Sequence, residues 1–338
     1  VNSLQIEEGE NATDYEEYFE PYELVKDYYQ IPLAKENRKR IEKLENEEDI
    51  HATHYTDEED QLISKVQQEI SDSTIVFSLF TDVHASDVLN EYEEENPNNN
   101  KGYKNYRNFA KIVRKISEKI GVDFIVNLGD TINSTSDEST DNHTDHTENK
   151  KRLAEFTMNI QKTNIPYVYA AAHHELYPWG DENALTKNEI LGLENRYSRY
   201  LKFVKNDNDV NKGYYYFDID DKKTRIIVLD SCCNSSADYS DLEINWVKNR
   251  ALETEYKIIV FSHMGTNETN SGDNPNNGNE LETILNNSGK IIAYYHGHTH
   301  WDNIIMPEES GINFPFISTE KAWCTTYVNF WRDNILGS

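Results

Sequence analysis

Short apolar segments alternate with helical segments from residue 74 to residue 295. The apolar segments are rich in β-branched and aromatic residues, which is typical of strands buried on both faces. They lie at residues 74–81, 123–128, 167–171, 214–219, 225–229, 257–262 and 291–295. The clearest helix is expected at 103–120, and others at 148–163, 187–204, 240–253 and 279–287. This alternation predicts a layered α/β domain.

The N-terminal part of the chain differs from this pattern. Residues 1–55 are acidic and weakly amphipathic, and we interpret them as a helical arm or linker. Within them, residues 33–49 mix both charge signs around a few apolar positions, so an oligomerisation segment is the alternative. A helix with one apolar face is predicted at 57–71 and leads directly into the first strand. We therefore place the α/β domain at residues 56–330.

The charge of the chain restricts its partners. Its 338 residues contain 33 Lys and Arg against 61 Asp and Glu, which gives a formal net charge of −28. Such a field repels nucleic acid, and an anionic substrate needs a local positive centre. The sequence has no apolar run long enough for a membrane span and no secretion signal at its start. We expect a soluble protein, either cytoplasmic or part of a virion or surface assembly.

Three polar segments of low complexity interrupt the domain, at residues 90–102, 134–149 and 264–279. Each begins near the end of a predicted strand, where ligands bind in open α/β sheets. Their lengths exceed what a compact connection needs. We therefore expect long surface loops that could form the walls of a groove.

Asp and His residues stand at the ends of five predicted strands. They are Asp82 and His84, Asp130, His173 and His174, His263, and His298 and His300. Carboxylate oxygen and imidazole nitrogen together suit Mn, Fe, Zn or Co. In an Asp-x-His or His-x-His pair, both side chains lie on one side of an extended segment. Each pair alone is weak evidence, but the series predicts a metal site.

In its order, this series resembles the signature of the calcineurin-like metallophosphoesterase superfamily: D-x-H, G-D-x-x-[ND], G-N-H-[ED], H and G-H-x-H. The resemblance covers roughly residues 75–301, and four of the five blocks match as they stand. It implies a four-layer α/β/β/α sandwich, here with an N-terminal helical extension, and two divalent transition-metal ions, Mn, Fe or Zn. By the same resemblance, one metal is held by Asp82, His84 and His300, the other by His263 and His298, and Asp130 bridges both.

The third block departs from the family pattern, because Ala172-His173-His174-Glu175 replaces Gly-Asn-His-Glu. Glu175 fixes the register, so His173 occupies the position of the ligating asparagine. Imidazole is the stronger donor and should favour zinc and make metal binding sensitive to acid. Alternatively, His173 points away and the second metal is held loosely. Ala172 also replaces the glycine best able to adopt a positive φ at this turn.

The resemblance further implies hydrolysis of phosphoric esters by metal-activated water. Asp130 and His174 are then the catalytic residues. His174 would stabilise the transition state or protonate the leaving group, and Glu175 would orient a ligand or His174. Trp301 directly follows His300 and is a candidate for the wall of a substrate groove.

The substrate is expected to be a phosphodiester or an extended phosphorylated molecule, because the loops are long and the motif blocks contain no Arg or Lys. Two alternatives stay open. One is a catalytically weakened, phosphoesterase-like binding or structural module of a larger surface or phage tail assembly, with the arm contacting an assembly partner. The other is a phosphodiesterase that acts on cell-wall teichoic acid.

Overall fold

The computed structural model describes residues 57–71, 74–85, 106–132, 146–176, 185–194, 213–233, 237–307 and 311–322. All of them belong to the second of two compact units, Val1–His54 and Tyr55–Ser338. The predictions for residues 1–55 and 90–102, and for most of 134–149, lie outside these ranges. No helix in the described ranges is both long and apolar enough to cross a membrane.

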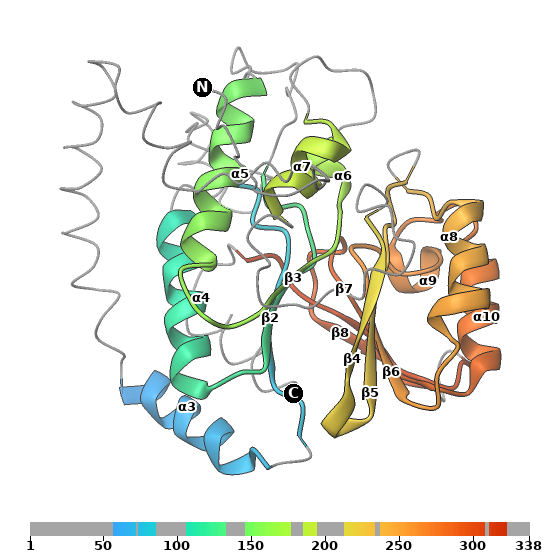
Figure 1. The fold of residues 1–338 in the computed structure, drawn as a ribbon, viewed down its shortest axis with the longest axis horizontal. Helices are drawn as coiled ribbons and strands as arrows, with labels where there is room; N and C mark the ends of the chain where they lie inside the picture. Colours follow the sequence, from blue (N-terminus) through green and yellow to red (C-terminus); the bar gives the residue numbers. More distant parts are fainter. Residues whose placement is uncertain are drawn as a thin grey trace, which may run out of the picture. The chain divides into compact units, whose positions relative to one another are not determined.

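Two β-sheets form the centre of the described domain (Figure 1). The first has the parallel order β1 (Phe77–Phe80), β2 (Phe124–Asn127), β3 (Tyr167–Tyr169). The second has the order β4-β5-β6-β7-β9-β8. Its strands are β4 (Tyr215–Ile219), β5 (Thr224–Val228), β6 (Lys257–Phe261), β7 (Ile291–His296), β8 (Asn303–Ile305) and β9 (Phe316–Ser318). The outer strands β4 and β8 pair antiparallel with their neighbours, and the four strands between them are parallel.

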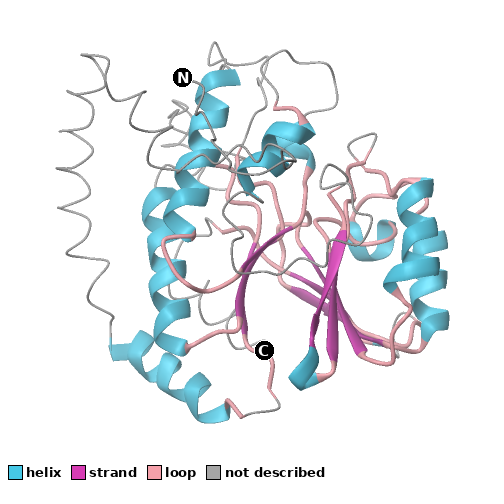
Figure 2. Cartoon of the chain, viewed as in Figure 1, coloured by secondary structure: helices cyan, strands magenta, loops and turns pink. Residues whose placement is uncertain are grey.

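Helices flank both sheets (Figure 2). They are α3 (Asp57–Glu69), α4 (Tyr106–Ile120), α5 (His146–Ile160), α6 (His173–Leu176), α7 (Lys187–Glu194), α8 (Asp241–Trp246), α9 (Glu268–Ser271) and α10 (Gly278–Ser288). Ser240 starts α8 by accepting a hydrogen bond from the Glu243 amide at 3.2 Å. The predicted helix at 240–253 is α8 followed by a π-helical turn, Val247–Ala251.

Three apolar cores separate these layers. One contains residues of both sheets, such as Val126 from β2 and Val228 from β5, so the sheets pack face to face. A second joins the first sheet to α3, α4 and α5, and a third joins the second sheet to α8 and α10. The structure therefore confirms the mixed α/β prediction and the seven predicted strands, and it adds β8 and β9.

Backbone hydrogen bonds continue beyond the strands and hold the loops that follow them. The amide of Asp82 donates to Gly129 O, and that of His84 donates to Asp130 O, both at 2.9 Å. In the second sheet, Gly297 N donates to His263 O at 2.9 Å. The carboxyl ends of neighbouring parallel strands thus bring the Asp and His residues of both sheets to one region.

Candidate metal centre

Five of the predicted site residues adopt left-handed backbone conformations. Their φ angles are 53° for Asp82, 46° for His84, 50° for Asp130, 68° for His298 and 60° for His300. A non-glycine residue rarely adopts such angles, because its Cβ approaches the following carbonyl oxygen. Strain of this kind persists only where the surroundings impose it, and it concentrates at functional sites.

Asp82, His84 and His300 form the first cluster of potential ligands. Asp82 Oδ1 lies 3.1 Å from His300 Nε2 and 3.6 Å from His84 Nε2, and the two ring nitrogens are 3.3 Å apart. A metal about 2.1 Å from each ligand would separate tetrahedral or octahedral donor atoms by about 3.0–3.4 Å. The spacing of the three donor atoms therefore fits one coordination sphere.

Hydrogen bonds fix the Asp82 carboxylate in the first cluster. Oδ2 accepts from Thr81 Oγ1 at 2.7 Å and from the His298 amide at 3.0 Å, which leaves Oδ1 for the cluster. Burial raises the pKa of Asp82, but hydrogen bonds from His300 and His84 outweigh it and hold the pKa well below its usual value. The group is ionised at neutral pH, as a metal ligand must be.

The second cluster contains Asp130, His173, His263 and His298. His263 Nε2 lies 3.1 Å from Asp130 Oδ2, and His173 Nδ1 lies 3.5 Å from Asp130 Oδ1. His263 Nδ1 hydrogen-bonds to Leu128 O at 2.9 Å, which places its proton there and leaves the Nε2 lone pair facing Asp130. A metal-binding histidine needs this tautomer.

Buried polar atoms without partners gather in this second cluster. Within the described ranges, Asp130 Oδ2, His173 Nδ1 and His263 Nε2 are buried and accept or donate no hydrogen bond. Such atoms cost about 1–3 kcal/mol each unless a ligand completes them. Three of them facing one carboxylate fit a bound cation.

Asp130 is the carboxylate that the clusters share. Its Oδ1 accepts from the His174 amide at 2.9 Å, and its Oδ2 lies 4.0 Å from His84 Nε2 and 3.9 Å from His174 Nε2. Burial raises its pKa, but the neighbouring His173 and His263 outweigh this and leave the pKa well below the usual value. The two clusters with one common carboxylate fit a dinuclear metal site.

The altered third block brings His173 into the second cluster, with its ring centre 5.2 Å from that of His263 and 5.1 Å from that of His298. The expectation that Ala172 replaces a residue with positive φ is wrong, since Ala172 is not among the described residues with positive φ. Gly129, at φ 93°, has that conformation instead, and a Cβ there would overlap the Ala172 methyl. The methyl therefore occupies space that Gly129 leaves open.

Two further residues hold the loop that carries Asp130. Glu175 accepts a hydrogen bond from the Thr131 amide at 2.5 Å, and burial together with the charge of Asp130 raises its pKa to about 8. Asn127 accepts from Gly129 N at 3.0 Å and donates to Thr131 Oγ1 at 2.8 Å. Glu175 thus orients the Asp130 loop. Asn127 lies inside a strand, where nothing in the sequence pointed to it.

Sequence reasoning also missed Asp273. Its Oδ2 lies 2.6 Å from His298 Nε2, and it follows α9 and Gly272 in the segment 264–279. This segment, expected to be a surface loop, is folded by a capping box at Asn267 and reaches the second cluster. In the sequence, nothing distinguishes Asp273 from the other acidic residues of these polar segments.

Comparisons with known proteins agree with this geometry. Residues 75–302 match the family model of calcineurin-like phosphoesterases. A dimetal phosphatase from Danio rerio is similar with a TM-score of 0.55 and 13% identity, over 73% of this chain and 87% of that chain. A purple acid phosphatase from yellow lupin (Lupinus luteus) seeds has a TM-score of 0.46 and 14% identity, over 75% of this chain and 47% of that one. No curated protein matches the sequence.

Proposed function

The chain belongs to the calcineurin-like phosphoesterase family, and from this premise we propose that it hydrolyses phosphoric esters at a dinuclear metal centre. The observation that carries the proposal is the pair of clusters that share Asp130, with buried donor atoms left without partners. The proposed ligands are Asp82, His84, Asp130, His173, His263, His298 and His300.

Divalent ions bound there polarise phosphoryl oxygens and lower the pKa of water, which supplies the nucleophile. The protein's part is to hold the ions and to position the ester. We assign one ion to the first cluster and the other to the second, with Asp130 Oδ2 serving both. Five neutral imidazoles with two carboxylates are a donor set that suits Mn, Fe or Zn.

His174 is the proposed catalytic residue that is not a ligand. Its side chain is 24% exposed, and its ring packs edge-on against His84 with 4.5 Å between ring centres. Burial lowers the pKa of His174 to about 4, and bound cations would lower it further. At neutral pH it is therefore uncharged, and its N–H can donate a hydrogen bond to a phosphoryl oxygen as negative charge develops. This supports transition-state stabilisation over protonation of the leaving group.

A diester or an extended phosphorylated molecule is the proposed substrate. In the described part of the chain, none of the hydrogen bonds or ion pairs of the seven proposed ligands involves Lys or Arg. A dianionic monoester is normally gripped by such residues. A diester carries one negative charge fewer and needs less compensation.

The position of His173 supports a hydrolase over a catalytically weakened module. That alternative depended on a third block that no longer supplies a donor. Because His173 Nδ1 faces Asp130 with no other partner, the altered block still offers a ligand atom. Cell-wall teichoic acid remains one example of the extended diester class.

Metal analysis combined with turnover tests the proposal. We expect about two equivalents of transition metal in gently purified protein, loss of activity after chelation, and recovery on adding Mn or Zn. Comparing kcat/KM for bis(p-nitrophenyl) phosphate and p-nitrophenyl phosphate then tests the substrate class. Trace metal with no gain on adding either ion would falsify the centre, whereas preference for the monoester would overturn only the diester assignment.

A further inference from the structure

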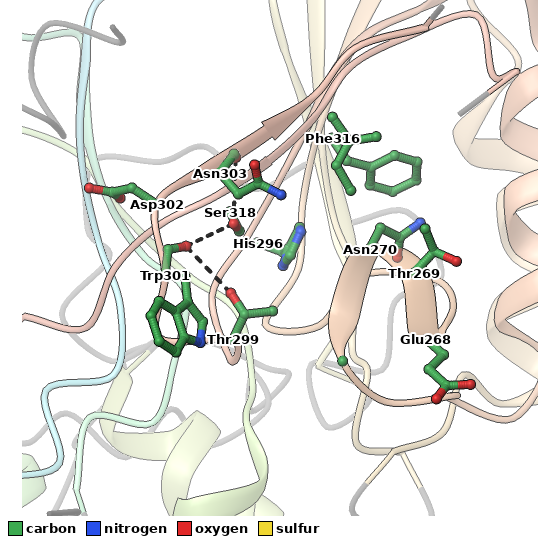
Figure 3. Close-up of a pocket in the computed structure, with 12 residues that line it drawn as sticks. Glu268, Thr269, Asn270, His296, Thr299, Trp301, Asp302, Asn303, Phe316 and Ser318 are labelled. Carbon is green, nitrogen blue, oxygen red and sulfur yellow. Dashed lines mark hydrogen bonds between the residues drawn. The ribbon is translucent and has the colours of Figure 1, made fainter. Parts of the chain in front are cut away.

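A pocket of about 320 Å³ lies beside the candidate metal centre (Figure 3). One side is formed by α9, with Glu268 and Asn270, and the other by the segment from His296 to Asn303 together with β9. Thr299, one of its lining residues, separates His298 from His300 in the chain. The pocket and both metal clusters therefore share one loop.

Most hydrogen-bond donors of this pocket are already engaged. The Asn270 amide nitrogen donates to Thr266 Oγ1 at 3.0 Å and to Glu282 Oε2 at 3.1 Å. The Ser318 hydroxyl donates to Trp301 O at 2.8 Å, as Figure 3 shows. Neither side chain keeps a strong donor for a ligand.

The acceptors, in contrast, remain open. His296 is 1% exposed, and its Nδ1–H donates to Gly297 O at 2.9 Å, so Nε2 carries the lone pair. No residue of the described ranges donates to that Nε2, and none pairs with the Glu268 carboxylate. A buried acceptor without a donor, in the wall of a cavity, indicates a ligand that brings the donor.

Charge points in the same direction. The lining residues include two carboxylates, Glu268 and Asp302, and no Lys or Arg. Trp301 is 73% exposed and lies across the pocket from Glu268 (Figure 3). Carboxylates and an aromatic face attract a cation and repel a second phosphate.

We propose that this pocket binds a primary ammonium group on the alcohol part of a phosphoric ester. The proposal rests on the proposed function, which places the phosphoryl group at the metals. An ammonium has three donors and no acceptor, so it complements His296 Nε2 and the Glu268 carboxylate. The site thus favours esters of amino alcohols over those of neutral or acidic alcohols.

Two matched diesters test this in the metal-loaded enzyme: p-nitrophenyl 2-aminoethyl phosphate and p-nitrophenyl propyl phosphate. They have nearly the same shape and differ in the ammonium group. We expect kcat/KM to be about ten-fold higher for the aminoethyl ester, the size of one favourable cation contact. Equal values for the two esters would overturn the proposal and leave the phosphoesterase function standing.

Glu268→Gln should reduce this preference to about two- to three-fold, because the amide keeps the shape and loses the charge. The matched control is Glu255→Gln, an exposed residue just before β6, at the opposite end of the strand from His263. It should keep the wild-type preference and activity. A full preference in Glu268→Gln would contradict the assigned site.

A binding measurement separates this proposal from the catalytic one. Saturation-transfer NMR with 2-aminoethanol and with 1-propanol reads the pocket without turnover. We expect a signal for 2-aminoethanol with the wild-type protein and with Glu255→Gln, and a much weaker one with Glu268→Gln. If neither diester is hydrolysed but this pattern holds, the function fails and the ammonium site stands; no signal for 2-aminoethanol overturns the site.

Discussion

The contact between Asp273 and His298 should tune one metal of the pair and spare the other. Asp273 Oδ2 lies 2.6 Å from His298 Nε2, so the proton of the ring is held on Nε2 and the lone pair remains on Nδ1. His298 belongs to the second cluster only. Asp273→Asn is therefore expected to weaken the metal of the second cluster and leave that of the first cluster unchanged.

The size of the effect follows from the exposure of the contact. Removing a carboxylate partner of a metal-binding histidine typically costs 10- to 100-fold in metal affinity. The Asp273 side chain is 54% exposed, so water screens its charge, and asparagine can still accept a hydrogen bond. We therefore expect the lower end, about ten-fold, or about 1.4 kcal/mol.

Titrating the metal-free protein with Mn or Zn against a chelating indicator measures the two affinities separately. The control is Asp221→Asn, an exposed residue in the short helix Asp220–Lys222 between β4 and β5. It should bind both metals like the wild type. The reasoning is refuted if Asp273→Asn also binds both like the wild type, or if it weakens both equally.

Four other variants test the assignments. Asp130→Asn should lose more metal than His84→Ala, because Asp130 serves both clusters; equal losses in metal analysis would contradict a bridge. His174→Ala should lower kcat about 10²–10⁴-fold with metal content intact, and loss of metal would make His174 a ligand. His173→Asn, which restores the family residue, should bind the second metal more weakly but with less sensitivity to acid, as titrations at several pH values would reveal. Deleting residues 1–50 should leave hydrolysis of a small ester intact, and aggregation of that truncation would contradict a dispensable arm.

The sequence was informative wherever the signal was local. The buried strands show as apolar runs, and the Asp and His residues at their ends are visible because strand ends and metal-binding residue types coincide. Even the replacement at His173 could be aligned through Glu175. These features need only neighbouring residues to be recognised, which is why the mixed α/β fold and the two clusters could be anticipated.

What escaped prediction depends on distant partners. The strands β8 and β9 are three residues each, and they are stabilised by pairing with each other and with β7. The polar segment 264–279 is ordered because Glu282 of α10 accepts hydrogen bonds from Asn267 at 2.7 Å and from Asn270 at 3.1 Å. Composition indicated only a polar loop, since the acceptor lies beyond the segment.

The five left-handed residues restrict how this centre can change during evolution. At about 1–2 kcal/mol each, their backbones together cost an amount comparable to the whole net stability of a typical domain, about 5–15 kcal/mol. The surrounding sheets and helices must supply that free energy before any metal binds. A lineage that no longer needs the metals would gain stability by exchanging Asp82, His84 or His300 for glycine or asparagine. Retention of Asp and His at all five strained positions is therefore what continued selection for the centre predicts.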